Sequence, residues 1–68
     1  MKTFDYKGFK CEMSKVDEGG YEYSIFRIKD KWELGGGWNP SLKNYKETKE
    51  ECKITVDDYY ENPSNYED

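Results

Sequence analysis

Residues 4–14 read FDYKGFKCEMS and predict a β-hairpin. The Lys-Gly pair at positions 7–8 separates two runs flanked by aromatic residues, and glycine tolerates the positive φ that a two-residue hairpin turn requires. In the second run Phe9, Cys11 and Met13 alternate with polar residues, which is the period of a strand with one face in solvent. We therefore expect an antiparallel pair of strands whose apolar face contributes to a core.

The strand pattern continues along the chain. Residues 17–20 (DEGG) have the composition of a turn, and the alternation of apolar and polar residues resumes at Tyr21. The alternation slips at positions 25–26, which indicates either a bulge or a strand covered on both faces. Positions 30–31 form the next turn candidate, and positions 32–34 predict a short fourth strand.

A glycine-rich segment, GGGWNPS, follows at residues 35–41 and is expected to be a loop. Glycine loses more conformational entropy in a strand than any other residue, so three in succession argue against one. The segment lacks the Lys-Ser/Thr of a P-loop and the spacing of a dinucleotide fingerprint, and we interpret it as a connector rather than a phosphate site. Trp38 either folds back onto the sheet or projects from this loop as a contact anchor.

The C-terminal third predicts a helix. Thr48 and Glu51 have the spacing of a capping box, so we place the helix start at Thr48. Pro63 limits the helix to an end near positions 61–62. The apolar stripe expected on the side of the helix that faces the core consists of Cys52, Val56 and Tyr59.

A longer helix that starts at positions 39–40 is the alternative. We favour the shorter helix because Lys49 would interrupt the apolar stripe of the longer one. In both versions Ile54 lies on the helix face opposite Cys52, where an exposed aliphatic side chain is a candidate for a contact surface.

These elements predict an α+β fold, an antiparallel meander of three or four strands with one face packed on a C-terminal helix. Residues 1–62 form a single domain, and residues 63–68 form an acidic tail that is loose unless Tyr66 packs against the domain. A domain of this size buries only about 60% of the surface of its unfolded chain, so we expect aromatic residues to supply much of the core. The predicted core is Phe4, Phe9, Cys11, Met13, Tyr23, Ile25, Cys52, Val56 and Tyr59.

Several classes of function are disfavoured. The chain has no histidine, which removes the commonest general base and the commonest metal ligand. Its two cysteines, Cys11 and Cys52, lack CxxC spacing and are expected to be buried as small apolar residues, although the sequence leaves open whether they are bonded. The adjacent carboxylates at positions 50–51 and 57–58 point about 100° apart on a helix and do not converge. We expect no catalysis, no cofactor and no metal.

The sequence contains no long apolar run and no hydrophobic signal segment after Met1, so we expect a soluble, cytoplasmic protein. Its charge is unevenly distributed. The chain has fifteen acids and eleven bases, and residues 57–68 contain five of the acids and none of the bases. The formal charge of −4 therefore comes entirely from the C-terminal end. Such an uneven charge distribution indicates the kind of partner that a protein binds and does not indicate its fold.

The acidic end is either a solubilising tail or a surface for a basic partner protein. Charge runs more commonly only solubilise, so the first interpretation is the default. One feature argues for the second interpretation: acids at a helix C-terminus oppose the helix dipole, and this cost has no evident folding benefit in the sequence. We therefore name as candidate partner-binding residues Asp57, Asp58, Glu61, Tyr60, Trp38 and Ile54.

The segments FDYKGFKCEM, GGYEYSIFRIKDKWE and NYKETKEECKITVDDYYENP together resemble a loose class of small phage and prophage proteins. These proteins combine a meander, opened by a Tyr-Lys-Gly-aromatic hairpin, with a closing helix. The resemblance spans residues 4–63, and the sequence departs from it at residues 35–38. Some phage proteins of this size are anti-CRISPR-like inhibitors of bacterial defence nucleases. The resemblance thus implies a non-catalytic protein-binding module, encoded by a phage, that acts on such a nuclease in the bacterial cytoplasm through an acidic surface.

Two other functions remain open. A small domain with a thin core gains stability by pairing through a sheet edge, so the chain could be a self-associating, homodimeric accessory domain. A basic and aromatic sheet face could also bind single-stranded nucleic acid weakly by stacking, although the acidic balance of the chain disfavours it. The basic residues of that face would be Lys10, Lys15, Arg27, Lys29 and Lys31.

Overall fold

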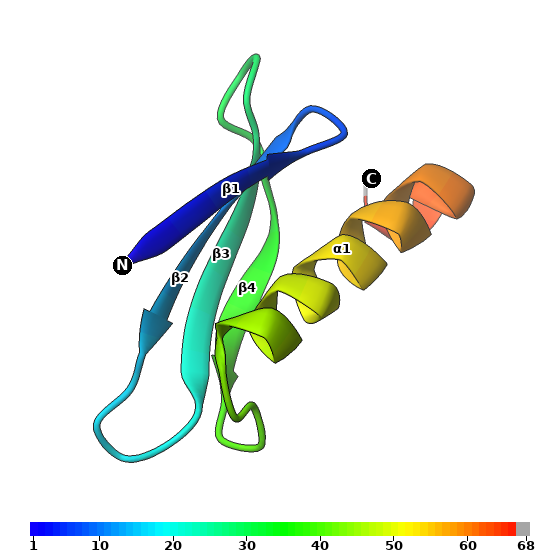
Figure 1. The fold of residues 1–68 in the computed structure, drawn as a ribbon. Coiled ribbons are helices and arrows are strands. Elements are labelled where there is room, and N and C mark those ends of the chain that lie inside the picture. The colour runs from blue at the N-terminus through cyan, green and yellow to red at the C-terminus, as the bar shows by residue number, and fades with distance from the viewer. Residues whose placement is uncertain (67–68) are drawn as a thin grey trace.

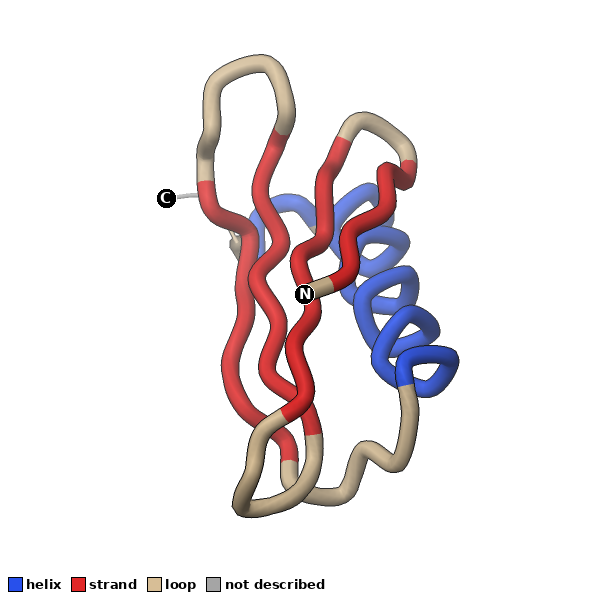
Figure 2. Tube along the Cα trace, turned by 60° about the vertical axis from the view of Figure 1, so that its left-hand side comes forward, coloured by secondary structure: helices blue, strands red, loops and turns tan. Residues whose placement is uncertain are grey.

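The computed structural model describes residues 1–66, which form a four-stranded sheet and a helix. The strands are antiparallel and neighbours in sequence order, and α1 packs on one face of the sheet (Figures 1 and 2), so the predicted α+β meander is confirmed. The elements are β1 (Lys2–Tyr6), β2 (Phe9–Lys15), β3 (Tyr21–Arg27), β4 (Glu33–Asn39), α1 (Tyr45–Glu61) and a 3-10 turn η1 (Pro63–Asn65). Over the described residues, no helix is both long enough and apolar enough to cross a membrane.

The β1–β2 hairpin turns at Lys7 and Gly8, as predicted. Both residues have positive φ, 50° and 86°, which is the geometry of a primed two-residue turn. The register pairs Tyr6 with Phe9 and Phe4 with Cys11, so their side chains share the face that α1 covers.

The prediction that residues 35–41 form a loop is wrong, because Gly35, Gly36 and Gly37 lie inside β4. An ideal β-carbon at Gly36 would lie 2.5 Å from the carbonyl oxygen of Tyr23, so only glycine allows β4 to pair this closely with β3. The backbone hydrogen bonds gained by this pairing offset the entropy that the three glycines lose. The fourth strand is consequently longer than the short strand expected at positions 32–34.

The slip in alternation expected at positions 25–26 is confirmed as an irregularity in the β3–β4 register. Ile25 pairs with Gly35, whereas Phe26 pairs with Glu33, which leaves Leu34 as the extra residue of a bulge. Leu34 is buried in the core. The bulge therefore adds an aliphatic side chain to the core from a strand that is otherwise glycine-rich.

Both predicted starts of the helix are wrong, because α1 begins at Tyr45 and is capped by Asn44. The Asn44 side chain accepts a hydrogen bond from the Glu47 backbone N–H at 2.8 Å, and the Glu47 carboxylate accepts one from the Lys43 N–H at 2.8 Å. Thr48 is instead fully buried, and its hydroxyl donates to the Asn44 carbonyl at 3.0 Å. Thr48 is small enough to lie against the sheet, while Asn44 supplies an equally good cap one turn earlier.

The observed core matches most of the predicted one. Phe4 and Tyr23 are only partly buried and pack against the core cluster, and the core also includes Tyr21, Leu34 and Thr48. The remaining predicted residues are buried, namely Phe9, Cys11, Met13, Ile25, Cys52, Val56 and Tyr59.

The two cysteines lie in contact inside the core as free thiols, so no disulfide joins them. Neither Cys11 nor Cys52 is accessible to solvent (0% each). The hydrogen bond with Cys11 and burial both raise the pKa of Cys52. The pair acts as apolar packing between β2 and α1, as the sequence suggested.

An aromatic cluster closes the core at the C-terminal end of α1. The ring centroid of Tyr59 lies 5.4 Å from that of Phe9, 5.6 Å from Trp32, 5.2 Å from Tyr60 and 5.9 Å from Tyr66. Tyr66 follows η1, so this contact packs residues 63–66 against the domain. The rest of the predicted acidic tail, Glu67 and Asp68, lies outside the described residues.

Candidate functional site

The face of the sheet opposite α1 is uncovered (Figure 2) and forms the candidate functional site. Alternation along β2, β3 and β4 directs acidic, small and aromatic side chains to this side, together with Lys10. We call it the open face and define it by Lys10, Glu12, Ser14, Glu22, Ser24, Phe26, Glu33 and Trp38.

Trp38 is the largest exposed side chain of the open face, with 54% of its surface accessible. Its indole Nε1–H donates a hydrogen bond to the Gly19 carbonyl at 2.8 Å, which ties the ring to the β2–β3 turn. Glu22 is its register partner on β3. Trp38 is therefore fixed at the edge of the sheet by its hydrogen bond and still exposed, and its role as a contact anchor stays a prediction.

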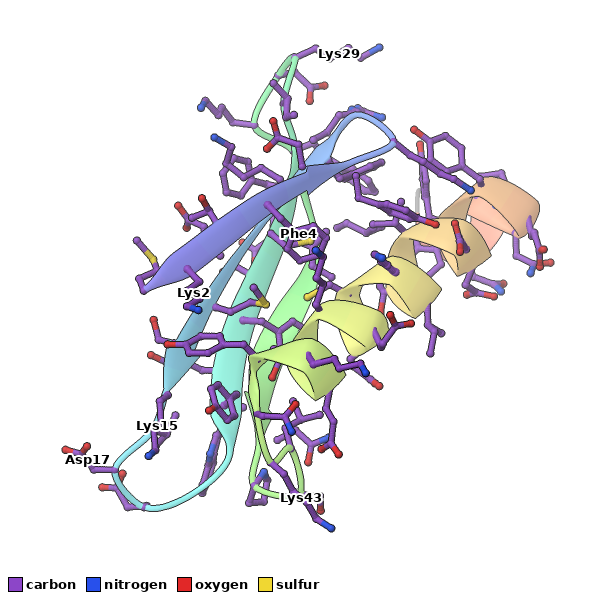
Figure 3. All side chains as sticks on the ribbon, in the orientation of Figure 1. Lys2, Phe4, Lys15, Asp17, Lys29 and Lys43 are labelled. Atoms are coloured by element: carbon purple, nitrogen blue, oxygen red, sulfur yellow. The ribbon has the colours of Figure 1, made fainter. Side chains whose placement is uncertain are left out.

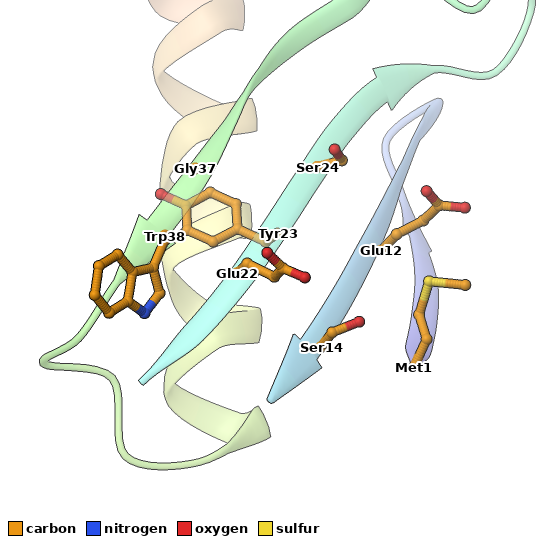
Figure 4. A pocket seen from close by; sticks show the side chains of 8 residues that line it. All are labelled: Met1, Glu12, Ser14, Glu22, Tyr23, Ser24, Gly37 and Trp38. Atoms are coloured by element: carbon orange, nitrogen blue, oxygen red, sulfur yellow. The ribbon is translucent and has the colours of Figure 1, made fainter. Parts of the chain in front are cut away.

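A shallow depression of about 420 Å³ lies beside Trp38 (Figure 4). Its lining includes two carboxylates, Glu12 and Glu22, and two hydroxyls, Ser14 and Ser24, with no basic residue. Within residues 1–66, neither Glu12 nor Glu22 takes part in an ion pair. The depression thus presents two carboxylates next to a fixed aromatic ring, an arrangement suited to cationic side chains, and Met1 also lines it.

A second depression of about 240 Å³ continues the open face toward the β3–β4 turn. Glu12, Ser24, Phe26, Lys31 and Glu33 line it, and the Lys31 ammonium lies 5.4 Å from the centroid of the Phe26 ring. The open face is therefore acidic on three adjacent strands and has an aromatic residue toward each end.

Asp57, one of the predicted partner-binding acids, instead supports the β1–β2 turn. Its carboxylate accepts hydrogen bonds from the Tyr6 hydroxyl at 3.0 Å and from the Lys7 ammonium at 2.8 Å. The hydrogen bond from Lys7 holds the pKa of Asp57 below its ordinary value, and the same bond raises the pKa of Lys7. Tyr60 lies on the same side of α1, where its hydroxyl donates to the Lys7 carbonyl.

Asp58 is rotated by about 100° from Asp57 around α1, and it holds the chain that follows the helix. It accepts hydrogen bonds from the Tyr66 hydroxyl and from the Asn62 side-chain amide, the latter at 3.2 Å. The hydrogen bond to Asp58 raises the pKa of Tyr66. Asp57 and Asp58 therefore do have a folding role, contrary to the premise on which their assignment to a partner rested.

Glu61 and Ile54 lie on the outer face of α1, away from the sheet, where Ile54 is 61% exposed. A groove of about 520 Å³ beside Ile54 is lined by Leu42, by Lys46 and by three acids, Glu47, Glu50 and Glu51. Around the helix Glu61 lies between Asp57 and Asp58, at i+4 and i+3 from them, so the predicted trio shares one side of α1. Hydrogen bonds nevertheless tie Asp57 to the β1–β2 turn and Asp58 to Tyr66. Ile54 precedes Asp57 by three residues and Asp58 by four, so it lies on the same side of the helix as these acids and Glu61, whereas Trp38 lies on the far side of the sheet.

The basic residues proposed for a sheet face are dispersed. Lys10 lies on the open face 3.9 Å from Asp5, whereas Arg27 lies on the opposite face, where it contacts the Tyr59 hydroxyl at 3.2 Å. Lys15 and Lys29 lie at opposite ends of the sheet (Figure 3). The structure does not bring these residues together as a basic and aromatic surface.

No group of three or more His, Cys, Asp or Glu residues in the described part of the chain could hold a metal ion. Comparisons with protein-family models, with curated proteins and with solved structures find no match for this chain. The fold and the site together define a small α+β domain with one open, acidic sheet face and a fixed, exposed tryptophan. Its function has to be argued from that face.

Proposed function

We propose that the chain is a small, non-catalytic protein-binding module that docks its open face on a basic surface of a partner protein. The observation that carries this proposal is Trp38, an exposed ring fixed by its hydrogen bond to Gly19 and bordered by Glu22. Tryptophan is enriched among the residues that dominate binding energy at protein interfaces. A ring that is already held in place loses little conformational entropy when a partner covers it.

Charge on the open face supports a basic partner. Glu12, Glu22 and Glu33 come from three adjacent strands, and the net charge of the chain is −4. Complementary charge raises the association rate and selects among partners, even where it adds little affinity. Lysine or arginine side chains of the partner could contact the carboxylates and also the face of Trp38.

The outer face of α1 is the competing surface, and it supports docking less well. Ile54 is its exposed apolar residue, and it has no aromatic neighbour in the groove that it lines. The glutamates around it are long side chains that lose rotamer freedom on binding. The open face offers a larger fixed anchor together with the same sign of charge.

The resemblance to small phage proteins suggests a particular partner. We propose a bacterial defence nuclease in the host cytoplasm, whose groove for nucleic acid would accept an acidic protein surface in place of phosphates. Carboxylates on a sheet would then occupy positions that attract phosphate, and the chain would act as a competitive inhibitor. Inhibition should weaken with added salt, because the attraction between exposed charges is screened.

A pair of charge-matched variants tests the docking surface. Glu12→Lys/Glu22→Lys reverses two charges on the open face, whereas Glu50→Lys/Glu61→Lys reverses two on α1 away from it. The defined basic probe is deca-arginine, and its affinity is measured by calorimetric titration at low salt. The first variant should bind the probe at least about tenfold more weakly than the wild type, and the second variant should lose much less affinity. Equal losses would mean that net charge alone governs binding and would refute the assignment to the open face.

Trp38→Ala and Trp38→Phe test the anchor in the same titration. The alanine variant should lose more affinity than the phenylalanine variant, since Phe keeps a ring while losing the hydrogen bond to Gly19. The inhibitor proposal is tested separately by nuclease cleavage assays with the wild type and Trp38→Ala. Inhibition that is unchanged by Trp38→Ala would exclude the open face as the inhibitory surface.

A further inference from the structure

Lysines gather where β1 runs beside α1, on the opposite side of the sheet from the open face. Alternate residues of β1, at positions 2, 4 and 6, lie beside successive turns of α1, at positions 45, 49 and 53. The strand and the helix therefore run in the same direction. The ammonium groups lie close to aromatic ring centroids in three pairs, Lys2 with Tyr45 at 4.8 Å, Lys49 with Phe4 at 5.1 Å and Lys53 with Tyr6 at 5.6 Å. We call this strip the β1–α1 seam and define it by Lys2, Phe4, Tyr6, Tyr45, Lys46, Lys49 and Lys53.

The N-terminal part of the seam contains a groove of about 350 Å³. Three lysines and no acid are among its lining residues, and Figure 3 shows Lys2 and Phe4 on the strand that forms one wall. Within residues 1–66, no ion pair involves Lys2, Lys46 or Lys49. The groove is thus a local concentration of positive charge in a chain whose net charge is −4.

The C-terminal part of the seam is neutralised. Lys7 forms an ion pair with Asp57 at 2.8 Å, and the Lys53 ammonium lies 4.0 Å from a Glu50 carboxylate oxygen. An anionic ligand should therefore be attracted to the end of the seam that contains Lys2, Lys46 and Lys49.

Strand β1 is at the edge of the sheet, with β2 as its one neighbour in the described chain. Its outward backbone groups can therefore hydrogen-bond to an extended peptide that adds to the sheet. Alternate residues of such a strand point to the same side at intervals of about 6.8 Å. Lys46, Lys49 and Lys53 are separated along the helix axis by about 4.5 and 6 Å, so alternate carboxylates of the peptide would meet successive lysines.

A peptide fits the seam better than single-stranded nucleic acid. The rings of Phe4, Tyr6 and Tyr45 are partly buried and already have lysine ammoniums near their faces, which leaves little surface for stacking bases. The acidic balance of the whole chain also repels a polyanion more strongly than a short peptide with a few carboxylates.

We propose that the β1–α1 seam binds an extended acidic peptide of a partner protein, which adds a strand beside β1 and places alternate carboxylates against Lys46 and Lys49. This site is independent of the open face, has the opposite charge and lies on the other side of the sheet. The chain would then have two contact surfaces for segments of opposite charge.

The probe is the peptide acetyl-(Glu-Thr)4-amide, titrated into the full chain and followed by amide chemical shifts. The largest shifts should fall on β1 and on the first two turns of α1. A control peptide of the same composition with all glutamates in one block should bind at least about fivefold more weakly, because its carboxylates no longer alternate. A version that is N-methylated at alternate residues keeps the charge but loses the edge hydrogen bonds, and it should also bind at least about fivefold more weakly.

The matched variants are Lys49→Glu in the seam and Lys29→Glu in the β3–β4 turn, which change the net charge equally. Lys49→Glu should weaken binding of the peptide at least about fivefold more than Lys29→Glu does, and Lys49→Gln provides a milder version if the reversal perturbs the helix. Glu12→Lys/Glu22→Lys on the open face should keep peptide binding, which separates this site from the proposed function.

The proposal would be overturned by equal effects of Lys49→Glu and Lys29→Glu, by undiminished binding of the N-methylated peptide, or by chemical shift changes that map to the open face. Tighter binding of a ten-nucleotide oligo-dT than of the peptide would assign the seam to nucleic acid instead. If no version of the peptide binds, the lysines serve only to keep other strands from pairing with β1.

Discussion

Gly36 of β4 lies so close to Tyr23 of β3 that a β-carbon at position 36 would come within 2.5 Å of the Tyr23 carbonyl oxygen. A β-carbon at the neighbouring Gly35 would meet nothing within 4 Å. The glycine-rich strand therefore contains one position where glycine is required by contact and one where it is not.

Gly36→Ala should destabilise the protein by about 1–3 kcal/mol, because β4 has to move away from β3 to admit the methyl group. Gly35→Ala has room for its methyl group and should be neutral or stabilising by about 0.5 kcal/mol, since alanine lowers the entropy of the unfolded chain. Urea unfolding followed by tryptophan fluorescence measures both. Similar losses for the two variants would show that strand propensity, rather than the contact with Tyr23, determines the need for glycine.

The cap of α1 provides a second prediction. Asn44→Ala removes the acceptor for the Glu47 N–H and should lower the free energy of unfolding by about 1 kcal/mol. Asn44→Asp keeps the acceptor and places a negative charge at the positive end of the helix dipole, so its stability should equal or exceed that of the wild type. A loss for Asn44→Asp as large as that for Asn44→Ala would contradict the role of position 44 as the cap.

Turns, the bulge and the end of the helix could be predicted from the sequence wherever a single local sequence feature determined them. Gly8 alone marks the first turn, the slip at Ile25 marks the bulge, and Pro63 marks the end of the helix. The helix start was missed because two capping signatures, one beginning at Asn44 and one at Thr48, lie a turn apart and both end in glutamate. Burial of Thr48 against the sheet decides between them, and burial is a property of the tertiary structure.

The candidate site was predictable only in part, for a similar reason. Ile54 is exposed as expected, because an aliphatic residue opposite a core stripe has few partners to cover it. For Trp38 the sequence left open whether the ring folds back onto the sheet or projects. The assignment of the acids to a partner stays a prediction. The sequence did not show that Asp57 and Asp58 hydrogen-bond to Tyr6, Lys7 and Tyr66, because the first two of these residues reach the helix only by tertiary packing. The β1–α1 seam was missed because its groove joins residues from opposite ends of the chain, Lys2 with Lys46 and Lys49, and only tertiary packing brings them together.

Stability at acidic pH should depend on Asp30, whose carboxylate accepts hydrogen bonds from Arg27 at 2.8 and 3.0 Å and from the Trp32 N–H at 3.1 Å. The Arg27 hydrogen bonds, followed by the bond from Trp32, lower the pKa of Asp30 to about 2. Because the folded-state pKa lies below the unfolded value of about 3.9, this contribution is fully present above about pH 4 and is lost as the pH falls toward 2.

Asp30→Asn removes this pH-dependent contribution. Thermal unfolding between pH 2 and pH 6 should show the variant less stable than the wild type at pH 6 and approaching it near pH 2. Asp17→Asn, in the exposed β2–β3 turn, is the control, and its thermal stability should change with pH in the same way as that of the wild type. A constant difference between Asp30→Asn and the wild type at every pH would show that the hydrogen bonds, rather than the ionised carboxylate, matter at this position.

The thiols of Cys11 and Cys52 should be protected from reagents in the folded protein. Neither has accessible surface (0% each), so a reagent cannot reach either sulfur while α1 is packed on the sheet. Labelling by a disulfide reagent at pH 8 should be at least about a hundredfold slower than in urea, since it requires opening of the packing between β2 and α1. An added surface thiol, Ile54→Cys, should react rapidly in the same sample and provides the internal control. If the native cysteines reacted as fast as position 54, the helix would not be packed on the sheet as described, and the seam between β1 and α1 would lose its geometric basis.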